Sequence, residues 1–485
     1  MLTSPGGVQT EQTEPVTEGV TEGVTRGGGA RHRLRRALSS GHSLFVVVIT
    51  LAAALRAVVM LGYNTAQLYW YDSFTYLDTA VHLKPGGAFH PAGYSFFLRL
   101  LWPFHSVSLV VGVQHVMGLG MGLMIYLLLR RRALPAWGAT LATVPVLFNP
   151  SFLRLEHSVL SDTQVTFLVI AALTVLMWRA KPSVRSAAVA GVLLAVAGLT
   201  RTAAAPLLVL FVLYLVLQRA GWRHVVALAI AGTLPLAAYA GWYQQHHGRF
   251  ALSGSDGVAL WARTMTFADC SKIKPPADEA RLCPNGTVVD AAGEYVWAAD
   301  ASLNRLPGDR FSHNDLARSF ALRAIAAQPL DYLREVVSDA SLAFAWTPVS
   351  HPKRVVPALS LPVGSWPLPS FPLIHQVRVD YDPAIRGMAS VAPYDAFFAA
   401  YRFPNVLHGP LFGVVLLLGG LGAIGRRRPA LLPWAAATFL FVGPIAALDF
   451  DHRYMLPAVP IACIAAALGA ASLWSARRGR RATAR

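Results

Sequence analysis

One acidic side chain in an aromatic-rich stretch is the first candidate for chemistry. Asp72 lies within the segment 69–77, which also holds five aromatic residues. Because an apolar environment raises the pKa of a carboxyl group, we expect Asp72 to take a proton as a general base. The alternative is that Asp72 caps a short helix that begins at Ser73. Asp78 follows nearly two helical turns later and is a further candidate acid.

The composition of the chain indicates what kind of protein must position these acids. Hydrophobic residues make up 54% of it, charged residues only 14%, and the mean hydropathy is +0.45. Soluble domains carry about 25% charged residues, so a soluble enzyme and a disordered chain are both excluded. The net charge of +17 comes largely from short basic clusters between apolar runs, which predicts a membrane protein and no nucleic-acid partner. The sequence contains no Gly-rich phosphate loop, which argues against an ATP-driven pump.

Ten apolar runs are candidates for membrane-spanning helices, which need about 20 mostly apolar residues. The third and fifth are short and require packing inside a bundle. The runs cover residues 43–62, 107–129, 135–149, 163–178, 187–200, 203–217, 225–243, 408–425, 430–448 and 456–474.

Basic clusters set the predicted orientation, because Lys and Arg are enriched in short cytoplasmic loops. The clusters follow the second, fourth, sixth, eighth and tenth runs, on the same side as the basic stretch 31–36. We therefore expect a multi-pass protein of a cell membrane, bacterial by its Ala- and Arg-rich composition. Both termini are then cytoplasmic and the long polar segment extracytoplasmic.

The chain is expected to have five parts, which together predict an all-α polytopic membrane protein with a mixed extracytoplasmic domain. Helical spacing over 315–346 predicts helices within that domain. The parts are a disordered basic tail 1–41, a transmembrane module 42–243 with the outer loop 63–106, the extracytoplasmic domain 244–407, C-terminal spans 408–474 and a basic tail 475–485.

The three cysteines and one arginine add structural expectations. Cys270 and Cys283 lie 13 residues apart in the extracytoplasmic segment, where a disulfide is the natural pairing and two unrelated thiols the alternative. Cys463 lies in an apolar run and is expected to be a buried core residue. Arg56, inside the first span, must face protein or water, and we expect a structural pair with an acid in the bundle.

The order of these motifs resembles the GT-C glycosyltransferases, in particular the branch that includes protein mannosyltransferases and lipid A aminoarabinose transferases. In that branch the first outer loop carries the catalytic acid, which Asp72 matches by placement. The run His-Pro-Ala-Gly-Tyr from His90 to Tyr94 matches the family's Pro-containing motif. The turn that ends at Arg201 resembles its Leu-Thr-Lys/Arg turn, and the sequence around Arg453 resembles its Arg-Tyr-x-x-Pro ending.

The resemblance also implies further site residues. His90, Tyr94 and Tyr454 are implied to contact substrate, and Glu156 and Asp162 stand where relatives often place acids. For Asp162 the alternative is a helix N-cap, because Ser-Asp-Thr opens the fourth run. The family often has two adjacent acids where this chain has Asp72 followed by a serine. No cofactor is predicted, and the use of a divalent metal stays open.

The donor implied by the resemblance is a sugar on a polyprenyl phosphate. Its phosphate requires cationic side chains at the outer ends of helices, for which Arg201, Arg453 and Lys84 are candidates. The alternative for both arginines is contact with lipid headgroups. We therefore expect a hexosyl or pentosyl transferase that acts with inversion on an extracytoplasmic glycan, lipid or protein, among membrane lipids. A non-catalytic lipid-phosphate binder and a secondary transporter are the rival hypotheses.

Overall fold

The computed structural model describes residues 41–63, 65–355, 359–401, 407, 409–424 and 428–483, with side chains up to residue 474 except that of residue 70. Residues 1–40 of the predicted tail 1–41, and residues 426–427 of the basic cluster 426–428, lie outside the described residues. The regular secondary structure of the described part is helical apart from one pair of two-residue strands, as the predicted fold class requires.

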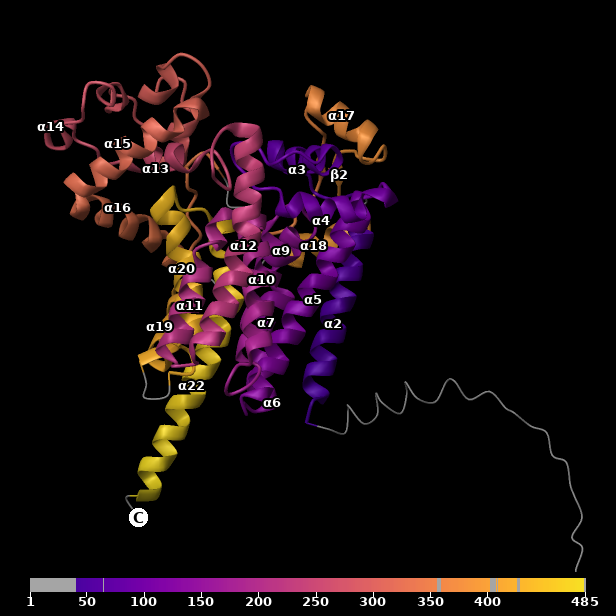
Figure 1. The fold of residues 1–485 in the computed structure, drawn as a ribbon. Coiled ribbons are helices and arrows are strands. Elements are labelled where there is room, and N and C mark those ends of the chain that lie inside the picture. The colour runs from indigo at the N-terminus through magenta and orange to yellow at the C-terminus, as the bar shows by residue number, and fades with distance from the viewer. Residues whose placement is uncertain are drawn as a thin grey trace, which may run out of the picture.

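Long apolar helices form a bundle that matches the predicted spans (Figure 1). Within the described residues, four helices are long and apolar enough to cross a membrane by themselves, and five more are apolar but shorter. The bundle helices are α2 (Ser43–Gly62), α5 (Val107–Arg131), α9 (Asp162–Met177), α10 (Val184–Thr200), α11 (Leu207–Leu217), α12 (Trp222–His247), α19 (Pro410–Ile424), α20 (Leu431–Ala447) and α22 (Ala458–Thr483).

The third predicted span differs from the others because it is broken. Residues 135–149 form two short helices, α6 (Ala136–Leu141) and α7 (Val144–Phe148), followed by α8 (Pro150–Glu156). Proline occupies the first turn of α7 and of α8, where it starts a helix but cannot continue one. The count of ten spans therefore stays a prediction, with this segment as its weakest member.

Small residues let the bundle helices approach closely. A Cβ at Gly191 of α10 would overlap the carbonyl oxygen of Leu228 in α12, and one at Gly469 of α22 would overlap the carbonyl oxygen of Leu418 in α19. Close contact of this kind is typical of membrane helices, which cannot rely on the hydrophobic effect to hold them together.

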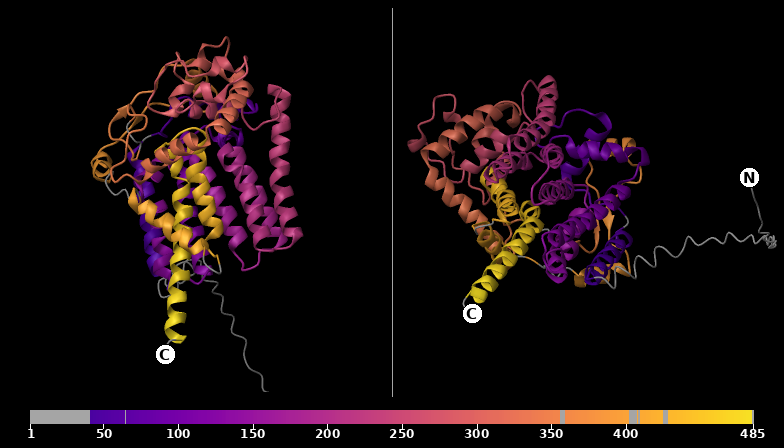
Figure 2. Two further views of the ribbon diagram at one scale, coloured as in Figure 1. Left: turned by 90° about the vertical axis from the view of Figure 1, so that its left-hand side faces the viewer. Right: turned by 60° about the horizontal axis from the view of Figure 1, so that its bottom comes forward.

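One end of the bundle, here called the loop face, carries the remaining elements (Figures 1 and 2). The loop between α2 and α5 contributes three of them: α3 (Trp70–His82), α4 (Gly93–Leu101) and η1 (Trp102–Phe104). The short turns η2 (Thr202–Ala204) and α21 (His452–Met455) also lie there, each at the junction of two bundle helices.

The segment 244–407 splits into two parts with different partners. The first part is a helical unit with its own buried core around Trp261, Leu303 and Phe320, and it contains the predicted disulfide between Cys270 and Cys283. The helices expected over 315–346 are present as α15, α16 and η7. The elements of this unit are α13 (Asp256–Thr264), α14 (Cys270–Ile273), η3 (Ala280–Leu282), η4 (Ala292–Val296), η5 (Ser302–Arg305), η6 (Arg310–His313), α15 (Asn314–Ala327), α16 (Pro329–Ser341) and η7 (Leu342–Phe344).

The second part returns over the first outer loop. It contains β1 (Ser365–Trp366), α17 (Pro372–Asp380), β2 (Met388–Ala389) and α18 (Tyr394–Tyr401). The strands pair antiparallel, with Ser365 opposite Ala389 and Trp366 opposite Met388. Figure 1 shows α17 over α3, and the two helices are in contact.

Hydrogen bonds join this second part to the loop that holds Asp72. The Tyr381 hydroxyl donates to the Leu98 carbonyl at 3.0 Å, and the Trp102 indole donates to the Asp380 carbonyl at 2.7 Å. The end of the long polar segment is therefore attached to the first outer loop.

Candidate active site

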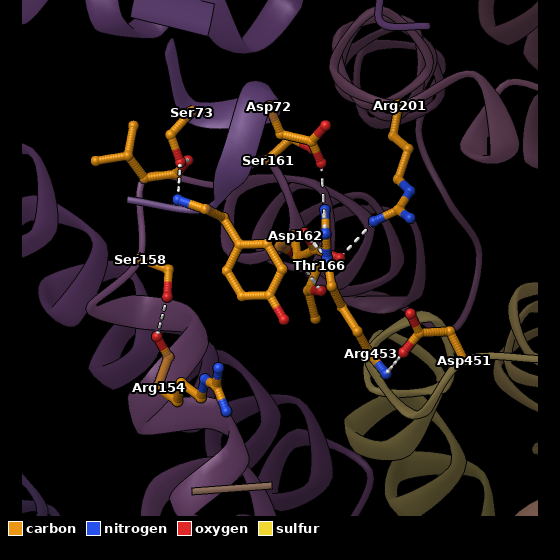
Figure 3. Close-up of polar contacts among 12 residues, drawn as sticks. Asp72, Ser73, Arg154, Ser158, Ser161, Asp162, Thr166, Arg201, Asp451 and Arg453 are labelled. Carbon is orange, nitrogen blue, oxygen red and sulfur yellow. Dashed lines mark hydrogen bonds and ion pairs between the residues drawn. The ribbon is translucent and has the colours of Figure 1, made fainter. Parts of the chain in front are cut away.

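Four charged residues from distant parts of the chain meet at the loop face (Figure 3). Asp72 lies in the first turn of α3, and Asp162 is the first residue of α9. Arg201 is the C-cap of α10, and Arg453 lies in the short helix α21. The sequence predicted each of them as a site residue, and the structure brings all four together.

Asp162 is the buried centre of this cluster. Its Oδ2 accepts a hydrogen bond from Arg453 Nε at 3.0 Å, and its Oδ1 forms an ion pair with Arg201 Nη1. The side chain of Asp162 is fully buried, whereas Arg201 and Arg453 are 20% and 14% exposed. The helix-cap alternative for Asp162 is therefore wrong, because its carboxylate holds two guanidinium groups. Both arginines have a protein partner in Asp162 and therefore do not depend on lipid headgroups for a counter-charge.

Local structure explains how the two arginines are aimed. Asp451 caps α21 by accepting a hydrogen bond from the Arg453 backbone N–H at 2.7 Å, which sets the direction of that turn. Arg201 has an extended backbone that ends α10. The ring of Tyr454 lies 4.5 Å from the Arg201 guanidinium and 5.9 Å from that of Arg453, and Tyr69 faces Arg453 at 5.5 Å. Aromatic faces stabilise cations in this arrangement.

The Asp72 carboxylate contacts an imidazole and a guanidinium group, and its side chain is one-third exposed. Its Oδ1 lies 3.3 Å from His90 Nε2, and its Oδ2 lies 3.5 Å from Arg453 Nη1. Burial raises the pKa of this carboxyl group, but the hydrogen bond from His90 and the charges of His90, Arg453 and Arg201 outweigh burial and lower the pKa to about 2.

Two expectations for Asp72 need correction. The raised pKa expected from its aromatic neighbours is wrong, because the sequence did not reveal how close the cations lie. The helix-cap alternative is also wrong: α3 begins at Trp70, and the Asp72 carboxylate turns away from the backbone toward His90 and Arg453.

The His-Pro-Ala-Gly-Tyr loop is held in place by a residue that the sequence analysis missed. The hydroxyl of Tyr239, in α12, accepts hydrogen bonds from the backbone N–H groups of Gly86 and Ala92, both at 3.0 Å. A Cβ at Gly86 would overlap the carbonyl oxygen of His90, so the loop closes on itself only with glycine there. A tyrosine in an apolar helix has no sequence signal that separates it from ordinary core residues.

A short backbone pairing links the helix of Asp72 to the helix of Asp162. Gln67 N donates to the His157 carbonyl at 2.9 Å, and Val159 N donates to the Gln67 carbonyl at 3.0 Å. The Ser73 hydroxyl then donates to the Val159 carbonyl at 2.9 Å. These bonds fix the two carboxylates relative to each other.

Four predicted site residues lie away from the cluster: Asp78, Lys84, Tyr94 and Glu156. Lys84 was expected to join the two arginines. It instead forms an ion pair with Asp78 at 2.9 Å, away from them. Tyr94 is fully buried and donates to Gln114 at 2.9 Å, so it supports the loop and is not open to substrate. Its ring packs edge-on against Tyr76.

Glu156 belongs to a separate buried cluster. Arg56 Nη2 lies 2.7 Å from Glu156 Oε1, and His115 Nδ1 lies 2.8 Å from Oε2. The structural pair predicted for Arg56 is thus confirmed, and Glu156 is its partner. Cys463 is buried in α22, also as predicted.

A group of metal-type ligands lies where the helical unit meets the end of α20. Donor atoms of Asp339, His351 and Asp449 all lie within 4.8 Å of one another. Asp339 is already paired with Arg263, and Asp449 accepts hydrogen bonds from His351 at 2.7 Å and from Gly293 N at 2.8 Å. These contacts describe a polar junction between the unit and the bundle.

Comparison with known proteins finds similarity among solved structures alone. No family model matches the chain, and no curated protein matches it. The archaeal oligosaccharyltransferase AglB from Archaeoglobus fulgidus, solved with an inhibitory peptide and a dolichol-phosphate, is 14% identical. That comparison covers 90% of this chain and 51% of AglB, with a TM-score of 0.40.

Two further structures are similar at the same level. ArnT from Cupriavidus metallidurans, bound to undecaprenyl phosphate, is 15% identical over 88% of this chain and 77% of its own, with a TM-score of 0.35. The S. cerevisiae protein O-mannosyltransferase Pmt1–Pmt2 complex, bound to the sugar donor, is 15% identical over 43% of this chain and 34% of that one, with a TM-score of 0.33. The chain thus spans about a third of the mannosyltransferase chain and about half of AglB. All three are enzymes of the GT-C class that the sequence motifs resemble.

Proposed function

We propose that this chain is an integral membrane glycosyltransferase that moves a hexose or pentose from a polyprenyl phosphate to an extracytoplasmic acceptor. The acceptor is a glycan, lipid or protein of the cell envelope. The observation that carries the proposal is the position of Arg453, which lies 3.0 Å from Asp162 and 3.5 Å from Asp72. It puts a cation that can bind phosphate beside a carboxylate that can face a reacting hydroxyl.

The two arginines supply the charge that a phosphate needs. Asp162 neutralises one of the two positive charges and holds both guanidinium groups in place, so that little reorganisation is needed when a phosphate binds. The 3.5 Å contact of Arg453 with Asp72 is longer than a charge-assisted hydrogen bond, which is about 2.7–2.9 Å. A phosphate oxygen can therefore take over this side of Arg453 at low cost.

The geometry supports a single displacement at the sugar. The acceptor hydroxyl loses its proton to the Asp72–His90 pair while its oxygen attacks the anomeric carbon. The bond from that carbon to the phosphate oxygen breaks, and its electron pair stays on the phosphate beside Arg201 and Arg453. Attack from the face opposite the leaving phosphate inverts the configuration of the sugar.

The proposed side of the membrane follows from charge. The described basic residues of the short loops, at 130–132, 179–185 and 219–223, follow helices that run away from the loop face. We therefore assign the loop face to the extracytoplasmic side. A reporter that is active only in the cytoplasm, fused after residue 300, should be silent, and activity there would reverse the assignment.

Two rival functions make different use of the same residues. A non-catalytic lipid-phosphate binder needs Arg201 and Arg453 but no proton acceptor. A secondary transporter would place its charges near mid-membrane, between broken repeats. The cluster of Asp72, Asp162 and the two arginines lies instead at helix ends on the loop face.

The test is transfer of labelled sugar by the purified protein. Radiolabelled undecaprenyl-phosphate hexoses and pentoses are supplied with cell-envelope extract as acceptor, and turnover is compared for Asp72→Asn and Asp78→Asn. Loss of a general base typically lowers turnover about 10²–10⁴-fold. We expect this loss for Asp72→Asn alone, because Asp78 is paired with Lys84 outside the cluster.

Binding of undecaprenyl phosphate is measured on the same variants. The proposal requires Asp72→Asn to bind it nearly as well as the wild type. Near-normal transfer by Asp72→Asn would show that the reaction does not need the Asp72 carboxylate. Binding of lipid phosphate with no transfer by any variant, the wild type included, would leave the non-catalytic binder as the better description.

A further inference from the structure

Asp72 does not stand alone at the reacting position, because His90 lies against it. The histidine side chain is about a quarter exposed, and its Nε2 points at Asp72 Oδ1 from 3.3 Å. The ring packs on Tyr76, with centroids 4.8 Å apart. Two backbone bonds to the Tyr239 hydroxyl, from Gly86 and Ala92, fix the loop on both sides of the histidine.

We propose that His90 takes the proton from the acceptor hydroxyl and that Asp72 acts through it, as the carboxylate that orients the ring and stabilises the imidazolium. This inference rests on the glycosyltransferase function proposed above. Within the Asp72–His90 pair, His90 is then the catalytic base and Asp72 is a positioning residue.

Both oxygens of the Asp72 carboxylate already have partners. One of its oxygens faces His90 and the other faces Arg453, so both lone-pair sides meet a hydrogen-bond donor or a positive charge. These neighbours hold the pKa of the carboxyl group at about 2. A general base is most effective when its pKa lies near the operating pH, which places this carboxylate far from the optimum.

Asp72 also selects the tautomer of the His90 ring. A carboxylate accepts a hydrogen bond, so the imidazole carries its proton on Nε2 and leaves the Nδ1 lone pair free to accept another. Among the described residues, no hydrogen bond is made by His90 Nδ1. The same logic orients the histidine of a Ser-His-Asp triad, where the carboxylate stabilises the imidazolium without itself taking the proton.

The transfer step moves one proton, forms one bond and breaks one bond. The acceptor O–H proton moves to Nδ1 and leaves an imidazolium that carries a proton on each ring nitrogen, with its Nε2 proton facing Asp72. The oxygen forms its bond to the anomeric carbon, and the phosphate leaves with the electron pair of the broken bond. After product release, the imidazolium returns its proton to water.

Several charged and titratable groups surround the pair and influence its proton affinity. Asp72 and Tyr76 come from α3, Arg453 from α21 and Arg201 from the end of α10. Asp162, from α9, contacts both arginines. A bound donor phosphate adds negative charge beside the arginines and thereby favours the imidazolium.

The dependence of kcat/KM on pH tests the inference on the wild-type protein without any substitution. A histidine base predicts that kcat/KM falls toward acid pH, because the base becomes protonated. A base with the pKa of Asp72, about 2, predicts a rate that stays flat down to pH 4. A flat profile between pH 4 and 8 would overturn the assignment.

Variants supply an independent readout. His90→Gln can still donate to Asp72 but has no basic nitrogen, and we expect turnover to fall about 10²–10⁴-fold with undecaprenyl phosphate binding unchanged. His90→Ala should regain part of its turnover when imidazole is added, whereas Asp72→Ala should not. His105→Gln is the matched control, because His105 faces the Tyr381 carbonyl, away from the cluster.

The outcomes separate this inference from the proposed function. If the wild type transfers sugar and His90→Gln does so equally well with the same pH profile, His90 is not the base and the glycosyltransferase proposal stands. If the wild type transfers no sugar from any donor, both fall together. Should His90→Gln fail to fold, the wild-type pH profile still decides the question.

Discussion

The bundle contains two buried clusters of opposite charges that lie close together in sequence but differ in access. Glu156 binds Arg56 and His115, and their side chains are at most 4% exposed. Asp162, only six residues later, binds two arginines that keep partial exposure at the loop face. The first cluster is closed to another partner, whereas the two arginines of the second keep exposed surface for one. Access therefore separates the candidate site from a structural ion pair.

Disrupting the cluster around Glu156 should have the largest effect, and this effect should be on stability. Glu156→Leu leaves Arg56 buried without its counter-charge, which typically costs about 3–5 kcal/mol. Thermal unfolding in detergent should show a large loss. The protein that remains folded should bind undecaprenyl phosphate normally.

The double change of Glu156→Leu with Arg56→Met gives the matched control. Replacing a whole buried ion pair with apolar residues is often neutral, so most of the lost stability should return. A double variant that folds but no longer binds undecaprenyl phosphate would place Glu156 in the site and remove the distinction between the clusters.

Disrupting the loop-face cluster around Asp162 should instead lower lipid-phosphate binding and turnover. Arg453→Ala removes a cation that serves both phosphate binding and the leaving group, and loss of one such donor typically costs about 10²–10³-fold in turnover. Affinity for undecaprenyl phosphate should fall as well. Arg453→Lys should restore only part, because an ammonium lacks the guanidinium fork that also holds Asp162.

Arg354→Ala is a suitable control for that series, since Arg354 is exposed and pairs with Glu294 outside the cluster. It should change neither binding nor turnover. An Arg453→Ala protein with wild-type affinity for undecaprenyl phosphate would show that the phosphate binds elsewhere.

The disulfide should matter only to the helical unit outside the bundle. Opening a loop of this length by Cys270→Ser with Cys283→Ser costs about 3 kcal/mol in the chain-entropy model. Hydrogen exchange should quicken across 256–341 and stay unchanged in α9 and α10. Two alkylatable thiols in the unreduced wild type, or equal changes in the bundle, would contradict this.

The smallest expected effect concerns the polar junction at His351. Burial lowers the pKa of this histidine, but its hydrogen bond to Asp449 outweighs burial. The negative charges of Asp449, Asp339 and Asp290 raise the pKa further. A raised pKa means that the fold favours the charged form. Its contribution to stability is therefore complete below about pH 6.5, where unfolded histidine titrates, and is lost as the pH rises through the folded pKa.

Thermal unfolding between pH 6 and 9 should reveal this loss as a falling transition temperature. His351→Gln should flatten the dependence, because it cannot take up the proton. An unchanged slope in that variant would assign the pH dependence to another group.

Much of the bundle could be predicted from the sequence, because the length of an apolar run fixes a helix within a few residues. Nine of the ten runs match single helices, and the exception contains the prolines that break it. The pairing of charges could not be predicted. Asp162 and Arg453 are 291 residues apart, and no local pattern joins them. Glu156 ends α8 and Asp162 begins α9, so the two acids belong to different helices and have different partners although they are six residues apart.

The candidate site was predicted residue by residue but not as a geometry. Charged residues at the ends of apolar helices are conspicuous, which identified Asp72, Arg201 and Arg453. Their mutual distances determine the chemistry, and these reversed the expected pKa shift of Asp72. Tyr239 remained hidden because buried aromatic residues are common in every helix of this kind.

The most direct test is a structure of the protein with undecaprenyl phosphate bound. The account predicts the phosphate oxygens within hydrogen-bond distance of Arg201 and Arg453, with Arg453 moved away from Asp72 and still bound to Asp162. A phosphate held at Lys84, or anywhere apart from these two arginines, would contradict it.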